Sequence, residues 1–323
     1  GGQGSKPAPP PEKWTGLIGE SGSPDSVLYV FERDGMLRLS QADRFDGALT
    51  RLACDSFRLE AGPDSGAPVV FVRGVKKTGK AVIVGGAIYE RRRIEPEAGA
   101  VFRIVPQRPV AELRREALAA SPPVDSASRR QPDLVELVKL DNSIHLDIRY
   151  ATANNFMGAV FYSEPRAFLQ RPAAEALVRA HRALKRLGYG LLIHDGYRPW
   201  YVTRMFWDAT PPAQRDFVAN PATGSRHNRG CAVDLTLYSL ATGLPIEMPG
   251  TYDEFSDRSH PDYPGGTSLQ RWHRDLLRWA MEREGFTVYS VEWWHFDYAD
   301  WREYPVLNLT FEALGPGNAG SPQ

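Results

Sequence analysis

Two histidines and one aspartate, in two separate segments, have the types and surroundings of metal ligands. Residues 225–234 read Ser-Arg-His-Asn-Arg-Gly-Cys-Ala-Val-Asp, which places His227 and Asp234 seven positions apart. The segment Glu292-Trp-Trp-His295 supplies a second histidine in an aromatic setting. Two imidazoles and one carboxylate form a ligand set for zinc that leaves a fourth position open for water. Such a metal lowers the pKa of bound water from about 16 to about 7 and so produces a nucleophile at neutral pH.

Glu292 is the candidate general base of such a site. A carboxylate beside the metal can accept the proton of the water and pass it to a leaving amine. Residues three apart on a regular strand point to opposite faces, so Glu292 and His295 can share a site only where a bulge or a strong twist interrupts the strand. The hypothesis therefore makes a structural demand on this segment.

The local sequence also predicts how Asp234 is oriented. If residues 231–237 form a strand, Ala232 and Asp234 share one face, while Val233, Leu235 and Leu237 pack on the other. A carboxylate isolated among apolar neighbours is costly unless it is paired or bound to a metal. For Asp234 alone, a hydrogen bond to the backbone is the alternative interpretation, and the second histidine segment favours the metal.

A third segment, Asp195-Gly-Tyr-Arg198-Pro-Trp200, follows a short apolar strand at residues 191–193. Proline disfavours the helical conformation for the residue before it, so Arg198 is held extended at the end of the strand. An arginine fixed there can donate two hydrogen bonds to a developing oxyanion or to a carboxylate. The alternative is a surface ion pair with Asp195, and this segment alone does not decide between the two.

The elements that must position these residues lie in a domain over residues 132–314. Periodic apolar residues predict one helix that begins at Pro172 and stops at Gly188, and another from Ser268 as N-cap to Gly285. Strands are expected at residues 191–193 and 286–291. Because helices and strands do not alternate strictly, we expect an α+β fold with a central antiparallel sheet flanked by helices.

A small all-β domain is predicted before it, over residues 14–106. Asp34-Gly35 between the apolar runs 27–31 and 36–39 indicates a hairpin, and the pattern recurs at 68–73, 81–84 and 87–89. Gly85-Gly86 is expected to mark a bulge or bend in the last strand. The domain contains no cluster of His, Asp and Glu, so its partner stays unassigned.

Residues 74–80, Gly-Val-Lys-Lys-Thr-Gly-Lys, have the glycine and lysine spacing of a phosphate-binding loop. Such a loop requires Ser or Thr next and a helix whose N-terminal amides hold the phosphate. The next residue is Ala81, which opens a β-branched run, so we interpret the segment as a hairpin turn.

The remaining segments have the composition of connections. Residues 1–13 are rich in Gly and Pro and are expected to be flexible, residues 107–131 form a linker with a short helix at 111–118, and residues 315–323 form a tail. A flexible start of this kind often remains behind a cleaved export signal, which favours a periplasmic or secreted bacterial protein. A trimmed cytoplasmic protein is the alternative.

Composition excludes several classes of protein. The chain has 323 residues with 39 basic and 39 acidic side chains, and this balance argues against a nucleic-acid partner. No apolar run approaches the roughly 18 residues of a transmembrane helix. Two cysteines, Cys54 and Cys231, cannot form a disulfide framework or a cysteine-rich zinc site. We interpret His181 and His273, both within helices, as structural or solvent-facing, and find no ligand-spaced partner for His145 or His194.

Four motifs in one order resemble the zinc D-alanyl-D-alanine dipeptidases of peptidase family M15, the VanX-like enzymes. They are Tyr-Ala-Thr-Ala-Asn-Asn-Phe-Met-Gly at 150–158, Asp-Gly-Tyr-Arg-Pro at 195–199, Ser-x-His-x-x-Gly-x-Ala-x-Asp at 225–234 and Glu-Trp-Trp-His at 292–295. The resemblance covers about residues 132–312, and the wider group includes D,D-carboxypeptidases. The N-terminal β domain is an addition to the minimal dipeptidase.

The resemblance implies one zinc ion per chain, held by His227, Asp234 and His295. It also implies Glu292 as general base and acid, and Arg198 as the group that stabilises the tetrahedral intermediate. These are the residues that the segments above single out.

Three further positions match substrate contacts of the family. Tyr150 and Ser225 correspond to substrate-contacting residues, and Asp253 falls where the family places an acid for the free ammonium of a dipeptide. Arg226 departs from the small polar residue of the resistance enzymes, and we expect it to hold the substrate carboxylate or to narrow the entrance. Tyr162 and Asn155, at weaker matches, are candidates for the pocket wall or for packing alone.

The expected activity is zinc-dependent hydrolysis of the small dipeptide D-alanyl-D-alanine. The nearest alternative is a D,D-carboxypeptidase that trims peptidoglycan stem peptides, for which an open groove in place of a buried Asp253 would be the sign. Another is a non-catalytic cell-wall-binding protein whose β domain does the recognising. A cytoplasmic dipeptidase would confer vancomycin resistance, whereas an exported one would recover D-alanine from wall turnover.

Overall fold

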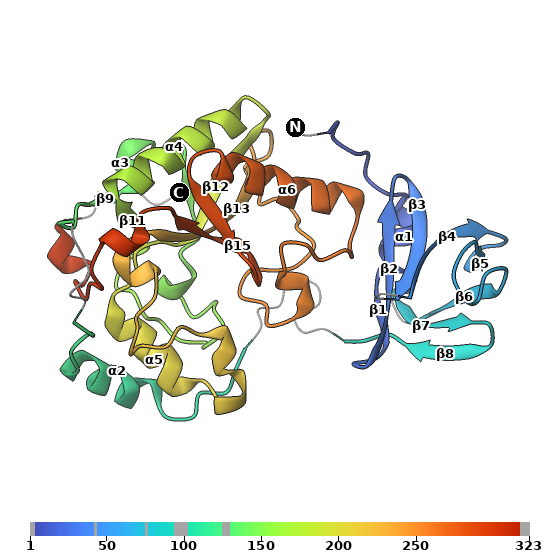
Figure 1. Cartoon of the computed structure of the whole chain (residues 1–323), viewed down its shortest axis with the longest axis horizontal. Helices are drawn as coiled ribbons and strands as arrows, with labels where there is room; N and C mark the ends of the chain where they lie inside the picture. The colour runs from blue at the N-terminus through green and yellow to red at the C-terminus, as the bar shows by residue number, and fades with distance from the viewer. Residues whose placement is uncertain (1–3, 42–43, 75–76, 94–102, 125–129, 317–323) are drawn as a thin grey trace.

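The computed structural model describes residues 4–41, 44–74, 77–93, 103–124 and 130–316, and it contains two units (Figure 1). Each unit has its own hydrophobic core, one built from residues between Leu17 and Val84 and the other from residues between Ile104 and Phe311. The presence of an antiparallel sheet in the first unit, and of helices together with strands in the second, confirms the mixed α+β class. Within the described residues, no helix is both long and apolar enough to cross a membrane.

The first unit is an eight-stranded antiparallel sheet in which each strand pairs with the next along the chain. A bridge between Ser21 and Arg91 brings the first strand against the end of the last, so the sheet curves back on itself. A one-turn helix, α1 (Glu12–Thr15), precedes it. The strands are β1 (Gly19–Ser23), β2 (Ser26–Arg33), β3 (Met36–Gln41), β4 (Phe45–Arg51), β5 (Ser56–Leu59), β6 (Pro68–Arg73), β7 (Gly79–Val84) and β8 (Ala87–Glu90).

Two tight turns of this sheet contain glycines in backbone conformations with positive φ. Asp34 and Gly35, with φ of 53° and 74°, form the predicted hairpin turn between β2 and β3. The bulge expected at Gly85-Gly86 is wrong, because these residues are the two-residue turn between β7 and β8, with φ of 55° and 92°. Two successive positive φ values fit the twist of a tight hairpin, and glycine adopts them without strain.

The segment with the spacing of a phosphate-binding loop joins two antiparallel strands, β6 and β7. Gly74 donates its amide to the Thr78 carbonyl at 2.7 Å, and β7 follows at Gly79. Residues 75 and 76 lie outside the described part of the chain. A strand therefore stands where a phosphate loop requires a helix, as predicted.

The second unit is built on a five-stranded sheet in the order β10-β12-β13-β15-β14. Neighbouring strands are antiparallel except β10 and β12, which are parallel, and a separate two-stranded ribbon joins β9 to β11. The strands are β9 (Leu134–Glu136), β10 (His145–Leu146), β11 (Phe168–Gln170), β12 (Tyr189–Asp195), β13 (Ala232–Ser239), β14 (Phe286–Tyr289) and β15 (Glu292–Tyr298).

Helices cover both sides of this sheet (Figure 1). Two long helices, α4 and α6, pack on one side, and α2 and α5 pack together on the other. The helices of the unit are α2 (Val110–Ala119), α3 (Leu137–Leu140), α4 (Arg171–Lys185), α5 (Trp200–Ala209) and α6 (Ser268–Glu282).

The two predicted long helices begin close to the positions that their sequences indicate. Pro172 lies in the first turn of α4, where its missing amide costs nothing, and Gly188 adopts φ of 88° after the helix ends. For α6 the N-cap is Thr267 rather than Ser268, because the Thr267 side chain accepts the Gln270 amide while Gln270 reaches back to the Thr267 amide. This reciprocal pair moves the start of the helix by one residue.

Several segments that the sequence assigns to connections make ordered contacts. Helix α2, inside residues 107–131, buries Leu113 and Ala117 in the second core. Ile104, which the sequence analysis placed at the end of the β domain 14–106, packs in the second core as well. The Gly4 carbonyl accepts a hydrogen bond from the Trp272 indole at 2.9 Å. Residues 1–3 of the predicted tether, 94–102 of the predicted β domain, 125–129 of the predicted linker and 317–323 of the predicted tail lie outside the described residues.

Two buried glutamates of the β unit fasten it to the second unit. One carboxylate oxygen of Glu32 accepts the Ser268 amide at 2.7 Å and so binds the N-terminus of α6. Glu20 accepts the Tyr263 hydroxyl at 2.8 Å and pairs with Arg92 of its own unit at 2.7 Å. Glu20 and Glu32 are at most 3% exposed, so these contacts between the two units are buried.

Candidate metal centre and active site

The metal-ligand candidates meet because adjacent strands place them in register. Asp234 on β13 pairs directly with His295 on β15, and on the other side with Asp195 at the end of β12. His227 stands in a single helical turn just before β13, where Gly230 reverses the chain with φ of 69°. Val233 and Leu235 point the opposite way into the core, as the strand alternation predicts.

His227, Asp234 and His295 form a compact, buried group. The Nε2 atom of His227 lies 3.1 Å from Nδ1 of His295, and these two nitrogens lie 3.3 Å and 3.1 Å from Oδ1 of Asp234. Ligands bound at about 2.0–2.1 Å around a tetrahedral zinc stand about 3.3 Å apart, so the three atoms already have the spacing of a shared ion.

The hydrogen bonds of the two imidazole rings indicate that Nε2 of His227 and Nδ1 of His295 face each other with lone pairs. Nδ1 of His227 lies 2.8 Å from the Gly196 carbonyl, and Nε2 of His295 lies 2.9 Å from Asp297. Both partners only accept, so each ring carries its proton there and turns its unprotonated nitrogen toward the other. Oδ1 of Asp234 is buried without a hydrogen-bond partner. A cation satisfies all three atoms at once, and the group therefore fits a metal.

The electrostatics of the group also favour a positive charge. Burial lowers the pKa of His295, but the neighbouring carboxylates of Asp234 and Asp297 outweigh burial and raise that pKa to about 10. Burial raises the pKa of Asp234, but His227 and His295 bring it well below its usual range. Without a metal the site thus attracts a proton, which a divalent cation would replace.

Glu292 reaches the same site because β15 is irregular at its start. The pairing between β14 and β15 shifts register between Val288 and Tyr289, and Tyr289 pairs with Glu292. This is the interruption that the hypothesis demands, and it leaves Oε2 of Glu292 3.6 Å from Nδ1 of His295. Burial, with a contribution from the Asp234 charge, raises the pKa of Glu292 to about 7. A carboxyl group with that pKa can both accept and return a proton near neutral pH.

Arg198 both forms the ion pair with Asp195 and faces the site. Its Nε and Nη2 atoms lie 2.9 Å and 2.8 Å from Oδ2 of Asp195, and Nη2 is 3.8 Å from Oδ2 of Asp234. The pair is buried, and the guanidinium lies over the rings of Tyr150 and Phe206. Asp195 therefore acts as a fixed support that aims a positive charge at the cavity.

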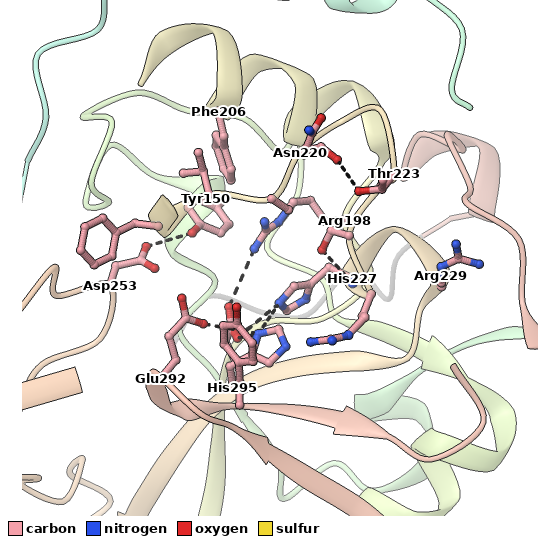
Figure 2. Close-up of a pocket in the computed structure, with 18 of the residues that line it drawn as sticks. Tyr150, Arg198, Phe206, Asn220, Thr223, His227, Arg229, Asp253, Glu292 and His295 are labelled. Carbon is pink, nitrogen blue, oxygen red and sulfur yellow. Dashed lines mark hydrogen bonds and ion pairs between the residues drawn. The ribbon is translucent and has the colours of Figure 1, made fainter. Parts of the chain in front are cut away.

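The predicted metal ligands, catalytic residues and substrate contacts line one cavity of about 490 Å³ (Figure 2). Tyr150 and Asp253 form one wall, where the Tyr150 hydroxyl donates to Asp253 at 2.9 Å. Asp253 adopts a left-handed φ of 57°, its buried side chain lines the cavity, and burial raises its pKa well above the usual value. Ser225 also lines the cavity, and its hydroxyl accepts the His227 amide at 3.1 Å.

Arg226 also lines the cavity, but its charge has a partner. Its Nη1 atom lies 2.7 Å from Asp297, and its guanidinium lies over the rings of Tyr289 and Trp301. Because Asp297 accepts from His295, the arginine supports a metal-ligand candidate through this carboxylate.

Three residues support the others; the sequence analysis missed Asp297 and Tyr252 and gave Asp195 only as a surface partner of Arg198. Asp195 holds Arg198, Asp297 holds His295, and Tyr252 donates its hydroxyl to Oδ2 of Asp234 at 3.2 Å. Asp297 had a recognisable signal, because it follows His295 by two positions on the same strand face. Tyr252 had none, since its contact depends on how the loop before α6 folds.

The weaker candidates and the other histidines have structural contacts. The Tyr162 hydroxyl donates to Asp195 at 2.7 Å, and the Asn155 side chain donates to backbone carbonyls of its own loop. His181 accepts the Leu191 amide, and His273 lies 2.9 Å from the Tyr189 hydroxyl. Neither Tyr162 nor Asn155 lines the cavity.

Replacing Asp297 by alanine should weaken zinc binding by about 10- to 100-fold, because outer carboxylates fix the ring orientation and basicity of ligating histidines. Competition titration against a chelator measures this, with the exposed Asp275→Ala as the matched control. An Asp297→Ala protein that binds zinc as tightly as the parent would contradict this support.

Comparison with known proteins shows sequence similarity over the second unit. Residues 130–312 match the peptidase M15 family described as D-ala-D-ala dipeptidase. A D-alanyl-D-alanine dipeptidase of Escherichia coli (strain K12) is 34% identical over 186 residues, which cover 57% of this chain and 95% of that protein. One from Enterococcus faecium is 36% identical over 194 residues, covering 54% and 95%. A third, from Enterococcus faecalis, is 35% identical over 193 residues, covering 53% and 95%.

Proposed function

Because the chain belongs to the D-Ala-D-Ala dipeptidase family of M15 peptidases, we propose that it hydrolyses D-alanyl-D-alanine with one zinc ion held by His227, Asp234 and His295. The observation that carries the proposal is the convergence of these ligands with Glu292 and Arg198 on one cavity. Donors of two imidazoles and one carboxylate are typical of catalytic zinc sites, which keep an open position.

In this mechanism a bound zinc would lower the pKa of a water molecule and polarise the scissile carbonyl. Glu292 accepts a proton from the water as its oxygen bonds to the carbonyl carbon. Arg198 stabilises the negative charge that develops on the carbonyl oxygen, and Asp195 keeps it oriented. When the carbon–nitrogen bond breaks, Glu292 returns its proton to the departing amine of D-alanine.

Asp253 supports a dipeptide as the substrate rather than a longer stem peptide. It is 9% exposed and lines the cavity, and its raised pKa shows that burial disfavours its charged form. A positive partner such as a free ammonium group would stabilise the charged carboxylate. An acylated peptide would bring an uncharged amide to the same place. This buried acid favours the dipeptidase over the D,D-carboxypeptidase.

The substitution Asp253→Asn should lower kcat/KM for D-Ala-D-Ala by about 10- to 100-fold, because the amide keeps the shape and loses the charge-assisted contact. The parent should turn over an acylated tripeptide that ends in D-Ala-D-Ala only slowly. Asp253→Asn should not lower that turnover further. Measured D-alanine release from both substrates tests this, with the exposed Asp262→Asn as control. If the parent prefers the acylated tripeptide, the carboxypeptidase is the better assignment.

The non-catalytic alternative is disfavoured by the same geometry. A binding protein has no need of a proton acceptor 3.6 Å from a metal-ligand candidate, or of a buried arginine aimed beside it. Zinc-loaded protein that releases no D-alanine from either substrate would restore that alternative.

A further inference from the structure

Asp253, the acid that favours a dipeptide, lies on a loop rather than on a strand of the sheet. This segment, residues 251–263, is called the Asp253 loop below; it lies between β13 and α6 and contains one short helical turn, Asp257–Ser259. Asp253 adopts a left-handed φ of 57°, which residues other than glycine rarely adopt. Such a conformation persists only where the surrounding structure fixes it. The contacts that fix the loop therefore determine where the carboxylate of Asp253 lies.

Inside the loop, the buried carboxylate of Glu254 holds together the chain on both sides of Asp253. One of its oxygens accepts the Thr251 amide at 2.9 Å and the Thr251 hydroxyl at 3.0 Å. The other lies 2.6 Å from Nε of Arg258. Glu254 is 1% exposed, so these contacts are shielded from water. The position of Asp253 is thus linked to the position of Arg258.

The β unit contacts the same loop through Glu20 on β1, and Figure 1 shows β1 on the side of the β unit that faces the second unit. One carboxylate oxygen of Glu20 accepts the Tyr263 hydroxyl at 2.8 Å, and the other pairs with Arg92 at 2.7 Å. Glu20 and Arg258 line the same cavity between the units. Burial raises the pKa of Glu20 and the positive charge of Arg258 acts against burial, so the two charges attract each other. Glu20 therefore faces the loop at two points, Arg258 and Tyr263.

The hydrolytic groups are held by other elements. The metal-ligand candidates belong to β13, to β15 and to the turn before β13, and Glu292 is the first residue of β15. Tyr252, through which the loop reaches Asp234, also stacks on His194 with ring centres 4.4 Å apart. Loosening the Asp253 loop should therefore displace the acid of the substrate site and leave the metal group in place.

We propose that Glu20 is a positioning residue for substrate binding: through Tyr263 and Arg258 it holds the Asp253 loop, and with it the carboxylate that takes the free ammonium group of the dipeptide. The inference rests on the proposed function and gives the β unit a part in it. Glu20 does not touch the substrate, but it raises the fraction of molecules in which Asp253 is in place. Because apparent affinity falls in proportion to the competent fraction, loss of Glu20 changes KM rather than kcat.

Two substitutions at this contact test the proposal. Glu20→Gln keeps the shape of the side chain and removes its charge, and Tyr263→Phe removes only the hydroxyl that Glu20 accepts. Each should raise the KM for D-Ala-D-Ala about three- to tenfold and change kcat by less than about twofold. Glu32→Gln is the matched control, since Glu32 also joins the units but binds the Ser268 amide of α6. It should leave KM unchanged.

A double variant separates positioning from a general effect on the fold. In an Asp253→Asn protein there is no charge to position, so adding Glu20→Gln should raise KM no further. Hydrogen exchange of residues 251–263, measured by mass spectrometry without substrate, should be faster in Glu20→Gln than in the parent and unchanged in Glu32→Gln.

Four results overturn the inference. They are an unchanged KM in both single variants of a parent that hydrolyses the dipeptide, KM increases that simply add in the double variant, an equal rise of KM in Glu32→Gln, and unchanged exchange of the loop. Each of them leaves the proposed function standing. A parent that releases no D-alanine overturns the proposed function instead, and the exchange measurement still tests whether Glu20 holds the loop. Zinc content measured in parallel identifies a variant that has lost its fold.

Discussion

The Glu292→Gln protein should bind one zinc ion per chain and release D-alanine from D-Ala-D-Ala with a kcat about a thousandfold below that of the parent. Glutamine keeps the length and hydrogen-bonding shape of the side chain but cannot accept a proton from the water. Glu292 lies beyond the three ligand candidates, 3.6 Å from the nearest of them, so its loss should leave the metal in place.

The measurement is kcat by D-alanine release, together with zinc content by atomic absorption on the same preparation. Glu282→Gln, at the exposed end of α6, controls for the change from acid to amide. A Glu292→Gln protein with near-parental kcat would refute the base assignment. Loss of zinc from it would instead make Glu292 a ligand.

The substitution His227→Ala should remove both metal and activity. One of three ligands disappears, and Oδ1 of Asp234 loses a nitrogen that lies 3.3 Å away. Loss of a supporting outer residue already costs 10- to 100-fold in metal affinity, so loss of a ligand should cost more than about a hundredfold. D-alanine release should fall to background together with the zinc content.

Zinc content after dialysis checks this result, and His145→Ala is the matched control. His145 lies on β10, where its ring stacks on Tyr238 well outside the ligand group. Comparison of the circular dichroism of His227→Ala with that of metal-free parent separates loss of metal from loss of fold. Unchanged zinc in dialysed His227→Ala would count against the ligand set.

The metal group was accessible from the sequence because its chemistry restricts the residue types. Few types of side chain bind zinc. One histidine precedes a predicted strand, an aspartate lies on that strand, and a second histidine follows another strand-like run, so few other sets of ligands are available. Strand alternation also gave the direction of Asp234, and the demand for an interruption near Glu292 is met at Val288 and Tyr289. Each of these inferences needs only local periodicity and ligand chemistry.

Contacts between distant segments were not accessible in this way. Tyr252 reaches Asp234, and Glu32 of the β unit binds the N-terminus of α6, 236 positions away. Nothing in the local pattern around these residues distinguishes them from exposed polar side chains. The same holds for Gly85-Gly86, where the pairing partners of β7 and β8 decide between a bulge and a turn.

The polar residues that hold the site residues in place were likewise only partly predictable from local sequence. The sequence analysis gave Asp195 as a surface ion-pair partner of Arg198, but the burial of Asp195 appears only in the folded chain. The Arg226 charge was expected to meet a substrate carboxylate or to narrow the entrance. Its pairing with Asp297 gives it a further role beside the metal ligands, one that depends on β15 lying next to the turn at residues 225–230.

The most direct test of the central claim is metal analysis coupled to a D-alanine release assay on the free dipeptide. Protein freed of metal by a chelator should be inactive, and activity should rise in proportion to added zinc until one ion is bound per chain. Full activity in the metal-free protein, or one tightly bound zinc with no release of D-alanine, would contradict the account.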